Sequence, residues 1–191
     1  MKKTALLFTL IMIYTSMCGS DCHKSNSPTN ALPPETHAGL NTMGCIVNGQ
    51  LFIPQTSGYP PGQFSNAGYE YGESSINFNW TDKPDCGFSI LRIYLDSVQL
   101  QAGDTITLGL MPDSVANSPV KAQWATYYSF PCDSGVIGSY STTSQVTGQV
   151  IIDYYDPLAF LIAGRFSFDA IDKYSDTIHV REGRFDMAIQ N

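Results

Sequence analysis

Apolar and polar residues alternate with a period of two along much of this chain, and this alternation limits the fold to β structure. Residues 75–80 read Ser-Ile-Asn-Phe-Asn-Trp, and residues 105–110 alternate in the same way. Successive side chains of a strand point to opposite faces, so each segment predicts a strand with one face in the core. No stretch of any length shows the 3.6-residue period of an amphipathic helix. We therefore predict an all-β domain.

Further strands are predicted where β-branched and aromatic residues gather. These segments are residues 88–95, 122–130, 147–155, 158–168 and 177–189. Residues 55–74, rich in Gly, Pro, Ser and Tyr, indicate a long surface loop. About eight or nine strands joined by turns predict an antiparallel sandwich or barrel.

The strongest local signal is the Asn-Gly pair at 48–49, which separates two apolar runs. Both residues accept the positive φ of a type I′ turn, so the pair predicts a two-residue β-hairpin. Pairing across this turn sets Cys45 beside Phe52 and Ile46 beside Leu51. Since both faces are then apolar, we expect the hairpin to be largely covered.

The last predicted strand contains two sets of apolar positions that one regular strand cannot bury together. Ile178 and Val180 place the inward face on even numbers, whereas Phe185 and Met187 place it on odd numbers. A shift of one residue exchanges the faces of a strand, so an extra residue must be inserted between the two sets. Gly183 is the natural position for this β-bulge, because glycine adopts a positive φ at little cost.

This bulge also suggests where a ligand could bind. It should turn Arg184 and Asp186 outward together, and bulges often lie next to functional sites. The predicted ligand region therefore consists of Tyr154, Asp156, Gly183 and Arg184.

The N-terminus predicts export. Lys2 and Lys3 precede an apolar run from residue 5 to 13, which is typical of a secretory signal peptide and too short to span a membrane as a helix. We assign residues 1–17 to this signal peptide.

Cys18 follows the apolar run and precedes a polar segment, a pattern that resembles the lipobox of bacterial lipoproteins, in which the cysteine carries lipid. Met17 departs from the small residue usual before that cysteine, so ordinary cleavage, with Cys18 and Cys22 left as thiols or disulfide partners, stays an alternative. Residues 18–43 have few bulky apolar side chains and predict a flexible tether. Residues 44–191 form the single β-rich domain of this interpretation.

Charge excludes some partners. Without residues 1–17, eight basic and 17 acidic residues remain, a net charge of −9. Nucleic-acid binding requires a basic face, and adhesion to anionic lipid by charge alone requires a basic cluster, so neither is expected. The expected partners are the membrane, through the lipid, and a glycan or protein. We expect no cofactor.

Five cysteines occur, and their spacing matches no zinc motif. If Cys18 carries lipid, four remain and allow three pairings. We prefer a Cys86–Cys132 disulfide, because Cys45 lies in an apolar strand and Cys22 in the tether. The alternative is two or more buried thiols, since cysteine readily behaves as a small hydrophobic residue.

Catalytic motifs are weak, and no catalytic residue is assigned. The chain has no Gly-x-Ser-x-Gly sequence. His23 and His37 fall in the tether, where we expect nothing to orient them, and His179 alternates with apolar residues as an exposed strand residue would. Glycoside hydrolysis needs two facing carboxylates, and the last forty residues supply many acids. These acids are Asp153, Asp156, Asp169, Asp172, Asp176, Glu182 and Asp186.

The residues also bear on two further ligand types, calcium and sugars. Asp169, Asp172 and Asp176 fall in one apparent loop, but its spacing lacks the pattern of a calcium-binding EF-hand, so no metal site is assigned. The chain has eleven tyrosines. Exposed tyrosines, such as one of Tyr154 and Tyr155, could stack on sugar rings, although tyrosine also commonly fills the rim of a sheet.

Several motifs resemble those of a family of uncharacterised lipoproteins from Bacteroidetes. At the start these are Leu-Pro-Pro-Glu-Thr at 32–36, Gly-Leu-Asn-Thr-Met-Gly-Cys at 39–45 and Val-Asn-Gly at 47–49. Near the end they are Ile-Ala-Gly-Arg-Phe-Ser-Phe at 162–168 and the segment 176–187. The resemblance implies a β-rich head behind a lipid anchor at the outer membrane, on either its periplasmic or its outer side, and it leaves the activity open.

These observations favour a non-catalytic binding or structural module of the cell envelope. The alternatives are a glycan-acting hydrolase that uses C-terminal carboxylates and a sugar-binding module that uses exposed tyrosines. A deep cleft with facing carboxylates would favour the enzyme, whereas a flat apolar patch would favour an assembly subunit.

Overall fold

The computed structural model describes residues 28–54, 76–82, 87–96, 98–109, 122–132 and 137–188. The elements in these ranges are η1 (Pro28–Ala31), β1 (Thr42–Val47), β2 (Gln50–Phe52), β3 (Ile76–Asp82), β4 (Phe88–Leu95), β5 (Thr105–Leu108), β6 (Gln123–Phe130), β7 (Gly138–Ser141), β8 (Gly148–Asp156), β9 (Leu161–Ile171) and β10 (Thr177–Ala188). All strand pairings are antiparallel, and the only helical element described is the single 3₁₀ turn η1. The predicted all-β antiparallel fold is confirmed.

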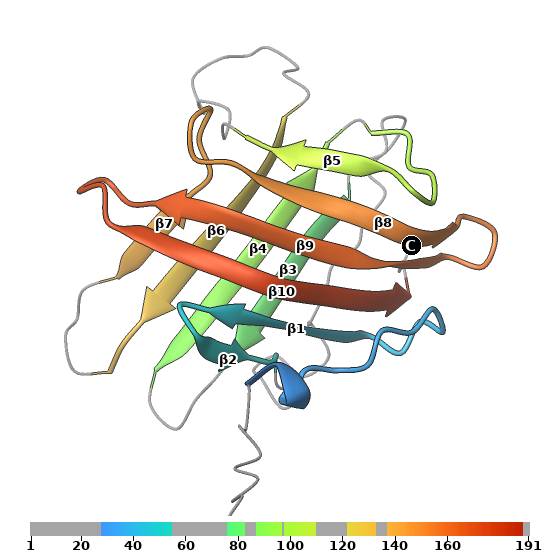
Figure 1. Cartoon of the computed structure of the whole chain (residues 1–191), viewed down its shortest axis with the longest axis horizontal. Helices are drawn as coiled ribbons and strands as arrows, with labels where there is room; N and C mark the ends of the chain where they lie inside the picture. The colour runs from blue at the N-terminus through green and yellow to red at the C-terminus, as the bar shows by residue number, and fades with distance from the viewer. Residues whose placement is uncertain are drawn as a thin grey trace, which may run out of the picture.

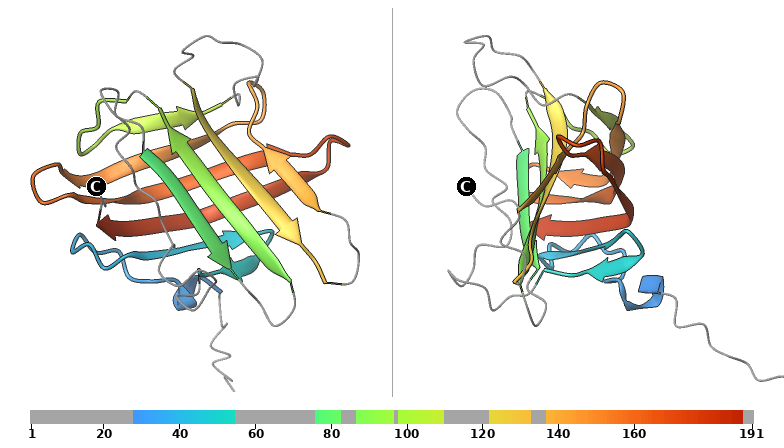
Figure 2. Two further views of the ribbon diagram at one scale, coloured as in Figure 1. Left: turned by 180° about the vertical axis from the view of Figure 1, so that it is seen from behind. Right: turned by 90° about the vertical axis from the view of Figure 1, so that its left-hand side faces the viewer.

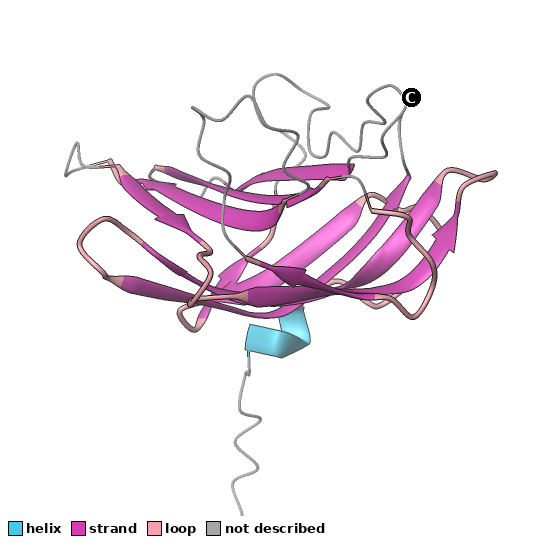
Figure 3. Ribbon diagram, turned by 90° about the horizontal axis from the view of Figure 1, so that it is seen from above, coloured by secondary structure: helices cyan, strands magenta, loops and turns pink. Residues whose placement is uncertain are grey.

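The strands form one hydrogen-bonded sheet that curls into a half-barrel, so that two layers face each other (Figure 1). The first layer has the order β5-β8-β9-β10-β1-β2, and the second has the order β7-β6-β4-β3. They are joined where Ser141 of β7 pairs with Ile171 of β9. Figure 2 (left), seen from behind, shows the second layer crossing in front of the first. In Figure 3, which views the layers from above, η1 lies on the outer side of the first layer.

The core fills the space between the two layers. On β9 the inward residues are Ile162, Phe166 and Phe168, which are at most 3% exposed, while Arg165 between them faces solvent. The opposite layer contributes the fully buried Leu91 of β4. The other buried core residues on the strands include Cys45, Phe52, Ile93, Leu95, Ala125, Val150, Ile152, Val180, Phe185 and Met187. On strands such as β5 and β9 the period-two alternation thus reflects one apolar face in the core.

The predicted hairpin is present. Cys45 pairs with Phe52 and Ile46 with Leu51, and the two residues of the Asn-Gly turn have φ angles of 48° and 81°. Leu51, however, is 37% exposed, because β2 is a three-residue strand at the edge of its layer. The expectation that both faces of the hairpin would be covered is therefore wrong for β2.

The predicted bulge in the last strand is also present. Val180 pairs with Phe168, but the next pair is Gly183 with Phe166, so β10 holds one residue more than β9 in this interval. On either side of the bulge the buried residues are Ile178, Val180, Phe185 and Met187. The change of inward face from even to odd numbers is thereby confirmed.

The conformation within the bulge differs from the expectation. The positive φ falls on Glu182, at 54°, and not on Gly183. Gly183 is required for a different reason: a Cβ atom there would lie 2.5 Å from a ring carbon of Phe166 and 2.6 Å from its carbonyl oxygen. Close packing of two strands, rather than backbone conformation, explains this glycine.

Two strands, β7 and β9, differ from the prediction. The strand β7 was not predicted, because its sequence Gly-Ser-Tyr-Ser contains no β-branched residue. β9 begins at Leu161 rather than 158, since residues 157–160 form a turn in which Phe160 has a φ of 56°. The predicted surface loop at 55–74 lies outside the described residues.

Candidate functional site

The outer face of the first layer carries a set of charged side chains from neighbouring strands. Three of the four arginines of the chain project from this face, one from β9 and two from β10. Arg165 and Arg184 are directly opposite each other across the β9–β10 pair. Like charges in this arrangement repel, so the pair needs negative partners.

An irregular segment, residues 32–41, crosses this outer face, and we call it the strap. Leu32 at its start is 8% exposed, and Pro33 packs over Gly44 so closely that a Cβ at Gly44 would lie 2.6 Å from the proline ring. At the other end Asn41 accepts a hydrogen bond from the backbone N–H of Ala188 at 3.0 Å. These residues belong to the predicted flexible tether, but the strap is packed on the domain.

Asp186 of β10 fixes the middle of the strap. Its Oδ2 accepts hydrogen bonds from the Thr36 hydroxyl and the Ala38 N–H, and its Oδ1 accepts one from the Gly39 N–H at 2.7 Å. Burial by itself would raise the pKa of Asp186, but these donors outweigh it and hold the pKa below its usual value. Asp186 lies on the outer face with Arg184, as predicted, yet it is only 2% exposed because the strap covers it.

Between the strap and the sheet lies a pocket of about 390 Å³, which we call the strap pocket. It is lined by Pro34, Glu35, Thr36, His37, Thr42, Asp153, Ala163, Gly164, Arg165, Arg184 and Phe185. A second hollow of about 260 Å³ shares Glu35, Arg165 and Arg184 with the strap pocket and extends along the bulge, where Gly183 also lines it. Its volume places the strap pocket within the range of small-molecule sites.

One wall of the strap pocket is a rigid ion pair. Arg165 donates from Nε to Asp153 Oδ2 at 2.9 Å and from Nη2 to Oδ1 at 2.8 Å, which is a bidentate arrangement. The register between β8 and β9 shifts between Ile152 and Tyr154, at the position of Asp153. The hydrogen bond and the charge of Asp153 raise the pKa of Arg165, so this guanidinium stays protonated.

The facing pair is looser. Arg184 Nη1 lies 3.8 Å from Glu35 Oε1 on the strap and 3.3 Å from the carbonyl oxygen of Pro33. The Glu35 side chain is 58% exposed, whereas that of Arg184 is 21% exposed. The strap pocket is thus bordered by one fixed and one adaptable arginine–carboxylate pair.

An aromatic pair stands beside the charged residues. The ring of His37, which lines the strap pocket, stacks on Tyr154 with a centroid separation of 5.1 Å and an angle of 8° between the planes. Stacking places part of the strap directly on β8. The expectation that nothing could orient His37 is therefore wrong.

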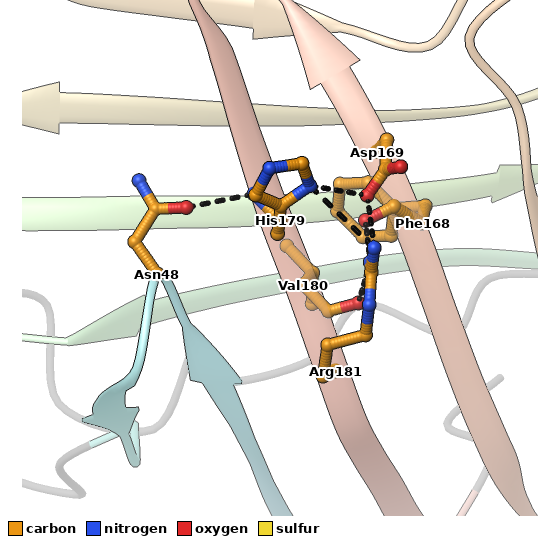
Figure 4. A network of polar contacts seen from close by, with 6 residues as sticks. All are labelled: Asn48, Phe168, Asp169, His179, Val180 and Arg181. Atoms are coloured by element: carbon orange, nitrogen blue, oxygen red, sulfur yellow. Dashed lines mark hydrogen bonds and ion pairs between the residues drawn. The ribbon is translucent and has the colours of Figure 1, made fainter.

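A second polar cluster lies further along the same face, at the β1–β2 turn (Figure 4). His179 Nδ1 and Arg181 Nη2 both contact Asp169 Oδ1, at 2.8 and 2.6 Å. The backbone N–H of His179 donates to Asn48 Oδ1 at 2.8 Å. Burial would raise the pKa of Asp169, but the hydrogen bonds from His179 and Arg181 lower it overall. Arg181 also donates to the carbonyl oxygen of Phe168.

This cluster connects the β1–β2 turn with β9 and β10, and it offers little for nucleophilic catalysis. Within the described ranges, no hydroxyl or thiol is hydrogen-bonded to the ring of His179. A serine or cysteine nucleophile would need that contact to be activated. The cluster is best understood as a connection between the β1–β2 hairpin, β10 and β9.

The four residues of the predicted ligand region have separate environments. Arg184 lines both hollows, Gly183 lines the smaller one, and Tyr154 supports His37 at the larger one. Asp156 does not line either: its Oδ1 accepts hydrogen bonds from the N–H groups of residues 158 and 159 and so closes the β8–β9 turn. Of the four, only Arg184 lines the strap pocket; Gly183 lines the neighbouring hollow, Tyr154 contacts a residue of the pocket wall, and Asp156 is a turn residue.

The remaining predicted residues are the cysteines and the acids of the β9–β10 turn. Cys18 and Cys86 lie outside the described residues. Cys132 is disulfide-bonded. Because Cys86 is not described, its pairing with Cys132 stays a prediction. Asp172 accepts hydrogen bonds from the N–H groups of residues 174 and 176 and closes the β9–β10 turn. In the described part of the chain no three His, Cys, Asp or Glu side chains are grouped to hold a metal ion.

Sequence reasoning missed Glu35 and His37, which line the strap pocket from the strap. Both fell in a segment whose composition predicts a tether, and local composition does not show contacts between residues 150 positions apart.

Comparison with known proteins gives no relative: no family model, curated protein or solved structure matches this chain. In the described part of the chain, no helix is long and apolar enough to cross a membrane.

Proposed function

We propose that this chain is an exported envelope lipoprotein whose β head is a non-catalytic binding module, with the strap pocket as its ligand site. The signal peptide, Cys18 and the resemblance to lipoproteins of Bacteroidetes support the location and the anchor. The observation that carries the binding role is the pocket itself, in which charged side chains from three strands and the strap converge.

The chemistry of the described acids argues for binding rather than hydrolysis. A general acid in glycoside hydrolysis needs a raised pKa so that it is protonated near neutral pH. Asp169 and Asp186 instead have lowered pKa values. Asp153 has both oxygens engaged by Arg165. These three carboxylates are therefore suited to holding structure and ligand contacts.

A glycan-acting hydrolase is the second candidate, and one observation favours it. Glu35 and Asp153 line the same pocket, and two carboxylates across a cleft are the machinery of most glycosidases. The assay is the release of reducing ends from soluble polysaccharides by the purified chain. Product formation that Asp153→Asn abolishes would establish the enzyme and contradict the binding role.

The binding role is tested with a ligand screen on the full chain in mild detergent, read by thermal unfolding. A panel of sugars, amino acids and short peptides is compared between the wild type and the Glu35→Gln/Arg184→Gln variant. A ligand at 100 times its Kd should stabilise the wild type by about 2.7 kcal/mol and leave the variant unchanged. If every stabilising ligand acts equally on both proteins, the strap pocket is not the site.

A further inference from the structure

The strap pocket is balanced in charge, and this balance restricts its ligand. Two cationic side chains, Arg165 and Arg184, and two anionic ones, Glu35 and Asp153, line it. Since the pairs neutralise each other, the pocket has no excess charge with which to attract an ion. The chain around it carries a net charge of −7 over its whole length, which repels anions from a distance.

Each pair nevertheless keeps hydrogen-bonding capacity. A guanidinium has five N–H donors, and the bidentate contact with Asp153 uses two of those of Arg165. Arg184 uses Nη1 toward Pro33 and Glu35. Ionised carboxylates have about four acceptor positions each, so the Glu35 and Asp153 oxygens can also accept from a ligand.

A neutral hydroxyl matches this arrangement better than a group that carries charge of one sign. It donates one hydrogen bond and accepts others, so it can lie between an arginine and a carboxylate and contact both. A ligand carboxylate only accepts and would be repelled by Glu35 and Asp153, while an ammonium only donates and would be repelled by the arginines. Several hydroxyls on one rigid ring would use several of these positions at once.

The apolar part of the lining suits the same ligand. Ala163 and the stacked His37 contribute carbon atoms beside the charged pairs. The faces of a pyranose ring present C–H groups that pack against apolar surface and against the electron-rich face of an aromatic ring. The pocket therefore combines apolar surface with paired donors and acceptors.

We infer that the strap pocket binds a neutral pyranose unit of a glycan, held by hydroxyl contacts to the Arg165–Asp153 and Arg184–Glu35 pairs. This assignment rests on the proposed binding role and names its ligand class. Arg165–Asp153 acts as the rigid half of the site, and Glu35 on the strap adjusts to the ligand.

The test uses sugar pairs that differ only in charge: glucose with glucuronate, and galactose with galacturonate. Each is titrated into the full chain in mild detergent and followed by calorimetry and by backbone amide NMR shifts. Glucose or galactose should bind and shift amides of residues 35–37, 153 and 163–165. Arg184→Gln and Asp153→Asn should each weaken this binding at least about tenfold, the effect of losing one charge-assisted hydrogen bond.

Matched variants control for charge and folding. Lys173→Gln and Asp176→Asn remove the same charges from the exposed β9–β10 turn and should leave binding unchanged. Glu35→Gln alters an exposed strap residue, so it should fold normally, weaken the neutral sugar and strengthen the uronate.

Two results would overturn the inference in distinguishable ways. If the wild type binds a uronate at least tenfold more tightly than its neutral partner, the pocket is a site but not for neutral sugars. If no sugar in the panel shifts the pocket amides, the ligand class is wrong. The binding role as a whole then falls only if the broader ligand screen also finds no pocket-dependent ligand.

Discussion

Asp186 holds the strap on the sheet, and its replacement by asparagine should both destabilise the domain and free the strap. The side chain is nearly inaccessible and accepts three hydrogen bonds, from Thr36, Ala38 and Gly39. Asparagine keeps the shape but removes the charge. Its NH₂ group must also face at least one of these donors, which leaves that donor unsatisfied.

The magnitude follows from the kind of hydrogen bond that is lost. Hydrogen bonds to a charged group contribute about 1.5–3 kcal/mol each, and the strap can recover part of the loss by exposing its N–H groups to water. We expect Asp186→Asn to lower the free energy of unfolding by about 2–4 kcal/mol, which in a domain of this size lowers Tm by roughly 5–15 °C.

The loss should depend on pH in a defined direction. Because the folded pKa of Asp186 is depressed, its stabilisation is fully present above the unfolded carboxyl pKa of about 3.9 and is lost as the pH falls through the folded value. The difference between wild type and Asp186→Asn should thus be constant from about pH 5 to pH 7 and should shrink below about pH 4.

The assay is thermal unfolding across this pH range, combined with hydrogen exchange of the Ala38 and Gly39 amides. Asp176→Asn is the matched control, because it removes the same charge from an exposed turn. Exchange at both amides should accelerate in Asp186→Asn only. A Tm equal to that of the control, or a difference that persists unchanged at pH 2, would refute the role assigned to Asp186.

Three further predictions concern the bulge, the disulfide and the anchor. Gly183→Ala should destabilise by about 1–3 kcal/mol because the new Cβ meets Phe166, while Gly109→Ala, where a Cβ has nothing within 4 Å, should have little effect; equal Tm values would contradict this. Peptide mass spectrometry without reduction should find Cys86 linked to Cys132, and Cys86→Ser should cost about 4 kcal/mol of stability, as expected for a loop of this length; a different partner would refute the pairing. Cys18→Ala should abolish fatty-acid labelling and release the chain from membranes, whereas labelling that persists would move the anchor elsewhere.

The strands and their faces could be predicted because they depend on local periodicity. Even the β10 bulge was predictable, since Val180 and Phe185 cannot both face inward on a regular strand. Its detailed conformation was not, because the tight approach of Gly183 to Phe166 depends on a neighbouring strand. Strand β7 was missed because pairing, not the propensity of its residues, makes it a strand.

The candidate site was only partly predictable for a related reason. Arg184 was identified through the bulge, which is a feature of one strand. Glu35 and His37 reach the site because the strap returns over the sheet and is fixed by Asp186, a contact across about 150 residues. Composition describes the strap as polar and poor in large apolar residues, which is equally true of a tether and of a segment held by hydrogen bonds.

The most direct test of a binding role for the strap pocket is to map the amide shifts caused by the first ligand that the screen identifies. The largest shifts should fall on residues 35–37, 153, 163–165 and 184, on both the strap and the sheet. Shifts confined to the separate hollow lined by Phe52, Tyr127 and Tyr140 would contradict the account and move the ligand site there.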